Sequence, residues 1–367
     1  MIDEKLLKKE ELVVYMLRSL YRRYGYAQYK MSKFEEYDLY VKNKDFLVSD
    51  RIITFNDTNG KLLALKPDVT LSIINHISEE PEGVQKMYYN ENVYRVSGES
   101  HSFKEIVQTG LECVGNIALY EICEVVSLAV KSLEAIGENF KLDISHAGLL
   151  SSLLSSVGLE GETEKKVREC IYRKNSGEVS SMMEEGKISA SQTALVNALM
   201  RNYKNPEELF DILESLCGDN EEMREFKAVC SALSSLGLFK NVNINFSLIN
   251  DMSYYSGVVF KGYIEGAPSS VLSGGQYDKL MKKFKKKAGA IGFAVYLDSF
   301  ERLNFEAPEY DADIVLIANG EKTEEIIKRA EELSMDGSRV LVQKKLPSDI
   351  RYRKALDMNG KELSENA

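Results

Sequence analysis

The sequence lacks the features of a metal-binding or disulfide-bonded protein. Its 367 residues include five cysteines and three histidines, with no Cys-x-x-Cys pair and no cysteine near a histidine at the spacing of zinc ligands. The cysteines are therefore expected to be reduced, structural thiols. His76, His101 and His146 form no recognisable catalytic set with serine or cysteine, and a structural or exposed place is expected for all three. No metal site and no cofactor are expected.

Long apolar runs and an excess of positive charge are also missing. Charged residues or serines interrupt every apolar stretch within a few residues, so no membrane-spanning helix is expected. The N-terminal stretch is too charged for a secretory signal, which indicates a cytoplasmic protein. With 57 acidic against 47 basic side chains and a formal net charge of -10, the surface as a whole is not suited to nucleic acid, and tRNA is not an expected partner.

The composition that remains is that of an ordinary globular protein, with 44% hydrophobic and 28% charged residues. Single hydrophobic cores seldom grow beyond about 250–300 residues, so the length indicates at least two domains. Patterns along the chain divide it into a large domain over residues 1–305 and a small one over residues 309–367.

The first third of the chain predicts an antiparallel sheet bordered by helices. Apolar residues recur at helical spacing until Gly25, and alternating or aromatic-rich segments follow. The expected helices cover residues 4–24, about 71–79 and 117–136, and the expected strands cover 26–34, 46–55, 61–66, 86–96 and 106–114.

A helical block over about residues 147–238 then separates this part from further strands. Strand character returns at 242–249 and 257–264, and residues 271–303 contain a Gly-Gly turn, a basic loop and a strand that leads into a helix. The two β parts must therefore meet in one sheet, which defines an α+β fold with a helical insertion. A short βαβ unit is expected over 313–343, and the charged stretch from Lys344 onward has little to bury and is expected to end in mobile residues.

Several segments, in this order, resemble the signature sequences of class II histidyl-tRNA synthetases. Arg95 stands on a strand that is followed by a loop and by a return strand with Gln108 and Glu112. Residues 65–70 (Leu-Lys-Pro-Asp-Val-Thr), 254–257 (Tyr-Tyr-Ser-Gly), 274–278 (Gly-Gly-Gln-Tyr-Asp) and 289–294 (Gly-Ala-Ile-Gly-Phe-Ala) are similar to further motifs of that family. The resemblance implies a class II synthetase-like antiparallel sheet flanked by helices, with residues 309–367 as a truncated anticodon-domain-like tail.

The sequence departs from the family pattern where adenylation needs arginine. Asn250 stands where the family has an Arg before its Tyr-Tyr pair, and Asp298-Ser299 occupy the place of a third-motif Glu-Arg unless a shift of three residues recruits Arg302. Lys104, Gln276 and Ser32 replace a second-motif Arg, the Arg of the Gly-Gly segment and the first-motif Pro.

These losses bear on catalysis because adenylation builds negative charge on a phosphate that guanidinium groups stabilise. Losing one such donor typically costs about 10²–10³ in rate. Lys104 supplies a charge but no bidentate fork. No catalytic residue is therefore expected in this chain.

The amino-acid side of the pocket is better preserved. The resemblance places Asp68 and Gln108 near an α-ammonium group, and Glu112 or a tyrosine hydroxyl near an imidazole nitrogen. Tyr255 is expected in the pocket, with Tyr254 in the core. The expected histidine-binding residues are Asp68, Thr70, Arg95, Gln108, Glu112, Tyr255, Gly275 and Tyr277.

Gln108, Glu112 and Arg95 have an ordinary structural alternative. The first two would otherwise form a solvated or edge face of the sheet, although the surrounding motifs favour the site. Arg95 is equally well explained as the partner of a carboxylate on the sheet. Gly275 is expected to allow close approach of the backbone to the bound amino acid. The basic run over residues 282–287 is better explained as a solvated loop than as a phosphate contact.

A synthetase-like body with a histidine pocket, a damaged ATP site and a short tail is similar to the regulatory subunits of ATP phosphoribosyltransferase. The resemblance implies a short catalytic subunit as partner, L-histidine as a feedback ligand, and a homodimer within a hetero-oligomer. Ser32 departs from the family at the dimer motif. A divergent histidyl-tRNA synthetase remains the leading alternative, and a stand-alone pseudo-synthetase that binds uncharged tRNA or another partner is the third.

Overall fold

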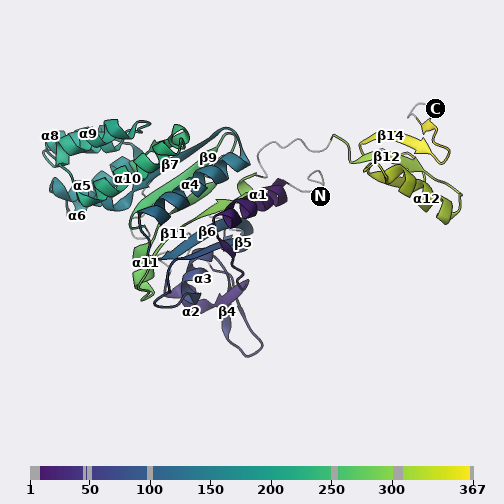
Figure 1. The fold of residues 1–367 in the computed structure, drawn as a ribbon, viewed down its shortest axis with the longest axis horizontal. Coiled ribbons are helices and arrows are strands. Elements are labelled where there is room, and N and C mark those ends of the chain that lie inside the picture. Colours follow the sequence, from purple (N-terminus) through teal and green to yellow (C-terminus); the bar gives the residue numbers. More distant parts are fainter. Residues whose placement is uncertain are drawn as a thin grey trace. The chain divides into compact units, whose positions relative to one another are not determined.

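The computed structural model describes residues 9–43, 47, 52–96, 102–248, 255–300 and 309–363. The chain forms two compact units, Met1–Leu303 and Asn304–Ala367, each with its own sheet (Figure 1). The part of the chain given by these ranges contains no helix that is long and apolar enough to cross a bilayer.

An eight-stranded sheet forms the centre of the first unit, with inner strands that are all antiparallel and with parallel pairs at both edges. The strands lie in the order β1 (Ala27–Gln28), β5 (Gln85–Val96), β6 (Phe103–Gly115), β11 (Gly289–Tyr296), β10 (Leu272–Gln276), β9 (Val258–Ile264), β7 (Phe140–His146) and β8 (Val242–Ile244). Strands from both sides of the helical block thus complete one sheet, as the sequence predicts.

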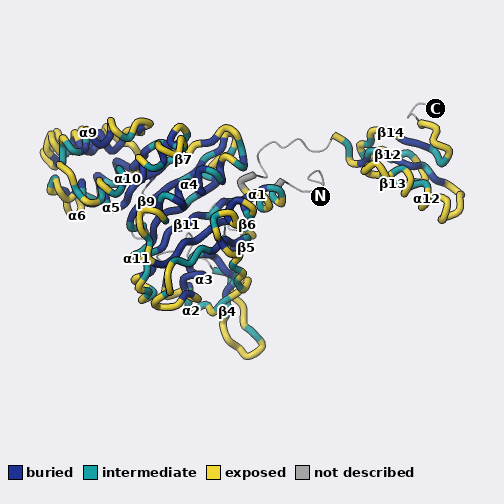
Figure 2. The backbone as a smooth tube through the Cα atoms, viewed as in Figure 1, coloured by how far each residue is buried: buried dark blue, intermediate teal, exposed yellow. Residues whose placement is uncertain are grey.

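Alternation along β6 assigns the two faces of this sheet. Leu111 and Cys113 belong to the core that also contains α1 (Lys9–Arg23) and α4 (Leu119–Ile136). On the opposite face, Val114 packs in a second core with residues of α3 (Val69–His76). The central strands and α4 are buried along most of their length (Figure 2). Gln108, Gly110 and Glu112 have the same parity as Val114, so they lie on the α3 side.

A small three-stranded sheet adjoins the α3 side. It consists of β2 (Phe34–Glu36), β4 (Leu62–Leu65) and β3 (Thr54–Asn56), with α2 (Tyr37–Val41) directly after β2. The hairpin between β3 and β4 is the one that the sequence predicts at residues 56–60, and Gly60 there has a φ of +82°.

Six helices form the predicted insertion beside the β7 edge of the main sheet (Figure 1). Their starts are set by polar caps: Asn175, Ser189, Asn205 and Asn220 each accept a hydrogen bond from a backbone N–H of the first turn. The helices are α5 (Ala147–Ser156), α6 (Gly161–Arg173), α7 (Ser176–Glu184), α8 (Ala190–Leu199), α9 (Pro206–Cys217) and α10 (Glu221–Ser235).

The second unit contains the predicted βαβ unit and two further strands. Strand β12 (Ala312–Ile317), helix α12 (Thr323–Ser334) and strand β13 (Val340–Gln343) form the parallel unit. The sequence did not predict the two strands after Lys344: β14 (Tyr352–Asp357) pairs with β12, and β15 (Glu362–Leu363) pairs with β14. Among the described residues after Lys344 only Ala355 and Leu356 are buried, which agrees with the expectation that this stretch has little to bury.

Several predicted elements of the first unit differ from the structure. Of the strand expected over 26–34, only Ala27–Gln28 and Phe34 lie in strands. Gly274 and Gly275 lie within strand β10 and do not form a turn. The strand expected over 242–249 ends at Ile244, and a 3-10 helix, η4 (Phe246–Leu248), follows because the Asn245 side chain accepts from the Ser247 N–H. Part of the expected basic loop is the end of α11 (Asp278–Lys283).

Candidate functional site

A buried carboxyl group on β6 forms the centre of the candidate site. Glu112 is 1% exposed and accepts hydrogen bonds from the Thr70 hydroxyl at 2.8 Å and from the Tyr277 hydroxyl at 2.5 Å. Thr70 lies in the first turn of α3, and Tyr277 precedes α11. The structure therefore brings together three of the predicted site residues from three separate elements.

Burial changes the acid–base behaviour of this group. Removal from water raises the pKa of Glu112 from 4.5 to about 8, the nearby negative charge of Asp68 acts in the same direction, and the two hydroxyl donors oppose the shift. At neutral pH the carboxyl group therefore holds a proton. A protonated carboxyl can donate a hydrogen bond to a neutral ring nitrogen, and it can transfer its proton if the ligand is more basic.

Two glycines make room around the carboxyl group. Gly292 lies opposite Glu112 on β11, and a Cβ atom there would lie 1.7 Å from Glu112 Oε2. A Cβ atom on Gly275 would lie 2.6 Å from the Val258 carbonyl oxygen and 2.8 Å from Cδ1 of Tyr255. Sequence reasoning predicted a close approach at Gly275 but missed Gly292, although a glycine inside an apolar strand is a usual sign of such an approach.

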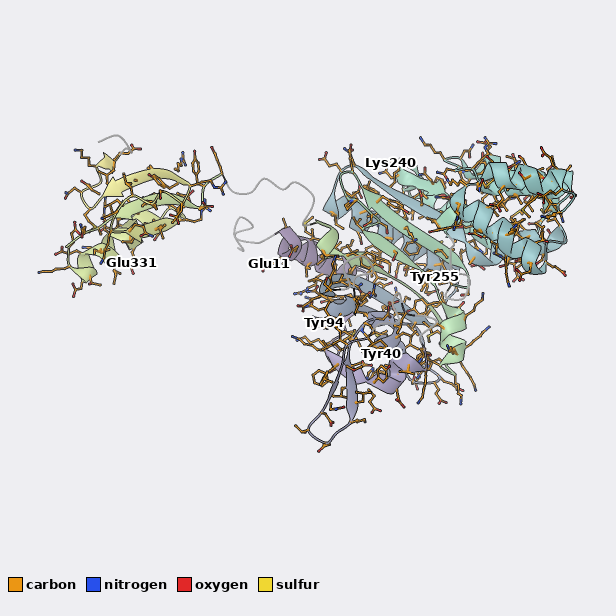
Figure 3. All side chains as sticks on the ribbon, turned by 180° about the vertical axis from the view of Figure 1, so that it is seen from behind. Glu11, Tyr40, Tyr94, Lys240, Tyr255 and Glu331 are labelled. Carbon is orange, nitrogen blue, oxygen red and sulfur yellow. The ribbon has the colours of Figure 1, made fainter. Side chains whose placement is uncertain are left out.

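Tyr255 (Figure 3) lies three residues before the first residue of β9. Its ring lies against Gly275, and its pKa is raised mainly by burial, with smaller contributions from Tyr296, Glu112 and Asp68. The predicted place of Tyr255 in the pocket agrees with these neighbours, but the residue does not lie on a strand as expected. Tyr254 lies outside the described residues.

Gln108 lies four residues before Glu112 on β6, and its side chain is on the same face of the sheet. It is 3% exposed and pairs across the sheet with Glu91 on β5 and Tyr296 on β11. Gln108 and Glu112 therefore lie on the same face of the sheet, as their spacing of four residues in one strand predicts.

Arg95 and Asp68 are bound to each other at one end of the site. The Arg95 Nε donates to the Pro67 carbonyl oxygen at 2.8 Å, and its Nη2 lies 3.5 Å from Asp68 Oδ2. Asp68 Oδ1 also accepts from the Leu71 N–H at 2.9 Å and caps α3. Of the two explanations open for Arg95, the structure shows the carboxylate partner.

A second buried ion pair, which the sequence reasoning missed, lies beside Gln108. The Lys66 ammonium group is fully buried and donates to Glu91 Oε2 at 2.9 Å. Burial lowers the pKa of Lys66, and hydrogen bonding to Glu91 opposes this effect. The sequence sign of this ion pair was the lysine inside the 65–70 motif. The identity of its partner could not be predicted, because it depends on strand register.

The other residues singled out in the sequence either have a structural role or lie outside the described residues. His146 is buried and caps α5, since its Nδ1 accepts from the Leu149 N–H at 3.0 Å. His76 contacts the Ser72 carbonyl oxygen through Nδ1 at 2.7 Å. Three positions lie outside the described residues, namely His101, Asn250 and Arg302.

The raised pKa of Glu112 gives stability a definite pH dependence. Folded Glu112 keeps its proton up to about pH 8 while the unfolded chain releases it near pH 4.5, so the free energy of unfolding falls as pH rises through this window, by at most about 1.4 kcal/mol per pH unit. Glu112→Gln has a similar shape and no titrating proton. The variant is expected to lose less stability than the wild type between about pH 5 and pH 8 in denaturant titrations. Equal pH slopes would mean that Glu112 ionises normally in the folded protein.

The fold and the buried polar site define the class of this protein. A largely antiparallel sheet, with buried polar side chains on the face opposite α4, is the arrangement of a class II synthetase-like domain. The chain belongs to the histidyl-tRNA synthetase family, whose family model matches residues 2–300.

Relatives of this chain include regulatory subunits and one tRNA ligase. An ATP phosphoribosyltransferase regulatory subunit from Clostridium kluyveri is 28% identical over 344 residues, which cover 90% of this chain and 88% of that protein. A histidine–tRNA ligase from Methanocaldococcus jannaschii is 26% identical, with 98% of this chain and 90% of that protein covered. The predicted resemblance to the regulatory subunits is confirmed by the first of these relatives and by several others of the same name.

Solved structures agree with the fold. A regulatory subunit/histidyl-tRNA synthetase from Bacillus halodurans C superposes with a TM-score of 0.75 at 24% identity, with 97% of this chain and 96% of that chain covered. A chain from an ATP phosphoribosyl transferase complex of Thermotoga maritima gives a TM-score of 0.63 at 22% identity, with 78% and 97% covered. These likenesses confirm the predicted class II synthetase-like α+β fold.

Proposed function

We propose that this chain is the non-catalytic regulatory subunit of ATP phosphoribosyltransferase, which performs the first step of histidine biosynthesis in the cytoplasm. It binds a short catalytic subunit and senses L-histidine for feedback control. The names of the relatives support the assignment to this enzyme. The observation that carries the histidine part is the buried Glu112 with its hydroxyl partners, Thr70 and Tyr277.

The site suits an imidazole better than an apolar side chain. A neutral imidazole nitrogen and the protonated Glu112 carboxyl share one proton, so they form a strong hydrogen bond in either protonation arrangement. A buried carboxyl without such a ligand partner keeps its desolvation penalty, and a purely apolar side chain would not relieve it. Thr70 and Tyr277 fix the orientation of the carboxyl group, and Tyr255 bounds the ring space beside Gly275.

The polar groups of Gln108, Asp68 and Arg95 suit the backbone of the amino acid. Gln108 offers a side-chain carbonyl to the α-ammonium group, and Asp68 supplies negative charge there. Arg95 reaches the same region and can pair with the α-carboxylate once it exchanges Asp68 for the ligand. Asp68 would then keep its role as the helix cap through its other oxygen.

We also propose a homodimer within the hetero-oligomer, formed through the first-motif segment by analogy with the class II fold. Tyr15 and Met16 of α1 are exposed large apolar side chains, which supports a surface that a second copy covers. Light scattering of the purified chain is expected to give twice the monomer mass.

A reconstitution experiment tests the function. The purified chain is mixed with a short catalytic subunit, and phosphoribosyl transfer to ATP is followed with and without histidine. A complex that forms and is inhibited by histidine is the expected result. Histidine-dependent pyrophosphate exchange by the chain alone would favour the divergent synthetase, and binding of uncharged tRNA without complex formation would favour the pseudo-synthetase.

Replacement of Glu112 by glutamine is expected to weaken histidine binding. The variant loses a proton-sharing partner for the imidazole, and the expected cost is about 1.5–3 kcal/mol, the usual scale for a hydrogen bond that involves a charged group. Calorimetry on wild type and Glu112→Gln measures this difference. Glu105→Gln is the matched control, because Glu105 is an exposed carboxylate on the same strand. Equal affinities of the folded Glu112→Gln variant and the wild type would refute the role of Glu112.

A further inference from the structure

One residue at the end of β10 holds two backbone amides of the segment that follows Tyr255. The Gln276 carbonyl oxygen accepts from the Ser256 N–H at 2.9 Å, and its side-chain Oε1 accepts from the Val258 N–H at 2.7 Å. Gln276 is 6% exposed and Val258 is fully buried. The Val258 amide therefore depends on this side chain in a place that water does not reach freely.

The residue between the two amides is a glycine for reasons of space. A Cβ atom on Gly257 would lie 2.0 Å from Oε1 and 2.6 Å from Cδ of Gln276. The φ of Gly257 lies outside the left-handed region, so alanine fits the backbone there but not the space. The Gln276 amide thus lies directly over Gly257, and any side chain at 257 would displace it.

This contact requires an acceptor at position 276. The histidyl-tRNA synthetase motif that residues 274–278 resemble has an arginine at this position, and a guanidinium group carries donors only. An arginine could not accept the Val258 N–H. The contact is therefore a property of the glutamine in this chain and does not follow from the family pattern.

We infer that Gln276 is the positioning residue of the histidine site, which it serves by fixing the Tyr255–Val258 segment so that the Tyr255 ring lies against Gly275 beside Glu112. The inference rests on the proposed function. Gln276 contacts the residues that follow Tyr255 in the chain, so it acts on the ligand through Tyr255. Without the acceptor, the Val258 N–H is buried and unpaired, and the segment gains stability by moving away from its present place.

Two substitutions at position 276 separate the hydrogen bond from the size of the side chain. Gln276→Met keeps the length and removes the acceptor, whereas Gln276→Glu keeps an acceptor. Amide hydrogen exchange of the ligand-free protein measures the segment, and calorimetry measures histidine affinity. We expect Gln276→Met to speed exchange in residues 256–258 and to raise the histidine Kd, each about tenfold, on the scale of one lost buried hydrogen bond. Gln276→Glu is expected to stay within about twofold of wild type in both measurements, since the acceptor remains.

Gly257→Ala provides an independent check, because it displaces the same amide from the other side. It is expected to reproduce both effects of Gln276→Met, and the double variant is expected to be no worse than either single one, because both remove one contact. Unchanged exchange in Gln276→Met would overturn the contact itself. Faster exchange with an unchanged histidine Kd would overturn the positioning role. A wild type that binds no histidine would refute the histidine site, and with it the inference, while exchange would still report the contact.

Discussion

Histidine-dependent exchange of pyrophosphate into ATP is expected to stay at background in the purified chain. Asn250 stands where the family places an adenylating arginine. Arg95, the second-motif arginine that remains, donates to the Pro67 carbonyl and pairs with Asp68. Since loss of one preorganised donor costs about 10²–10³ in rate, the loss of one donor and the pairing of Arg95 with Asp68, or with the α-carboxylate of bound histidine, leave little activation of the α-phosphate.

The assay requires a positive control and a variant that addresses the open third-motif assignment. A histidyl-tRNA synthetase assayed in parallel shows that the conditions support exchange. If the chain does exchange pyrophosphate, Arg302→Ala decides whether the shifted third motif supplies the missing arginine. Exchange that Arg302→Ala abolishes would establish a divergent synthetase in place of the non-catalytic subunit.

Local sequence patterns were sufficient for the parts of the fold that depend on a single element. The spacing of Gln108 and Glu112 in one strand correctly predicted a shared face, and the pattern over residues 147–238 correctly predicted a helical insertion. The strand patterns before and after the insertion were sufficient to predict that both parts join in one sheet. These features depend on periodicity, which adjacent residues determine.

Features that depend on strand register were not accessible in this way. Glu112 and Gly292 lie opposite each other only because β6 and β11 pair in one particular register. Lys66 reaches Glu91 only because the segment that precedes α3 lies next to β5. The tail strand β14 was missed because its charged sequence has only Ala355 and Leu356 buried, too few for a local pattern. The hydrogen bonds from Thr70 and Tyr277 to Glu112 were likewise not predicted, since the resemblance gave these residues a place in the site but no partner.

A reconstituted complex that carries Gln108→Ala and Glu112→Ala is expected to keep transferring phosphoribosyl groups at histidine concentrations that stop the wild type. Both side chains are buried on one face of β6, at 3% and 1% exposure, so their removal leaves the outer surface that a partner contacts unchanged. Feedback is a coupling free energy between histidine and the partner's substrates, and values of about 1–3 kcal/mol correspond to a roughly 5–150-fold change in affinity. The double variant loses the ligand and so loses this entire shift.

Because the coupling is reciprocal, histidine binding to the same complex provides a second measurement, which does not depend on the catalytic rate of the partner. Substrates of the catalytic subunit are expected to weaken histidine binding to the wild-type complex by the factor by which histidine weakens theirs. Glu105→Ala is the matched control, since Glu105 is exposed on the same strand and its complex is expected to retain the wild-type inhibition curve. If the double variant and the wild type are inhibited equally, histidine is not sensed at Gln108 and Glu112. The sensing site then lies on the catalytic subunit or elsewhere on this chain. The proposed histidine site would then be wrong, although membership of the family would stand, because it rests on residues 2–300 as a whole.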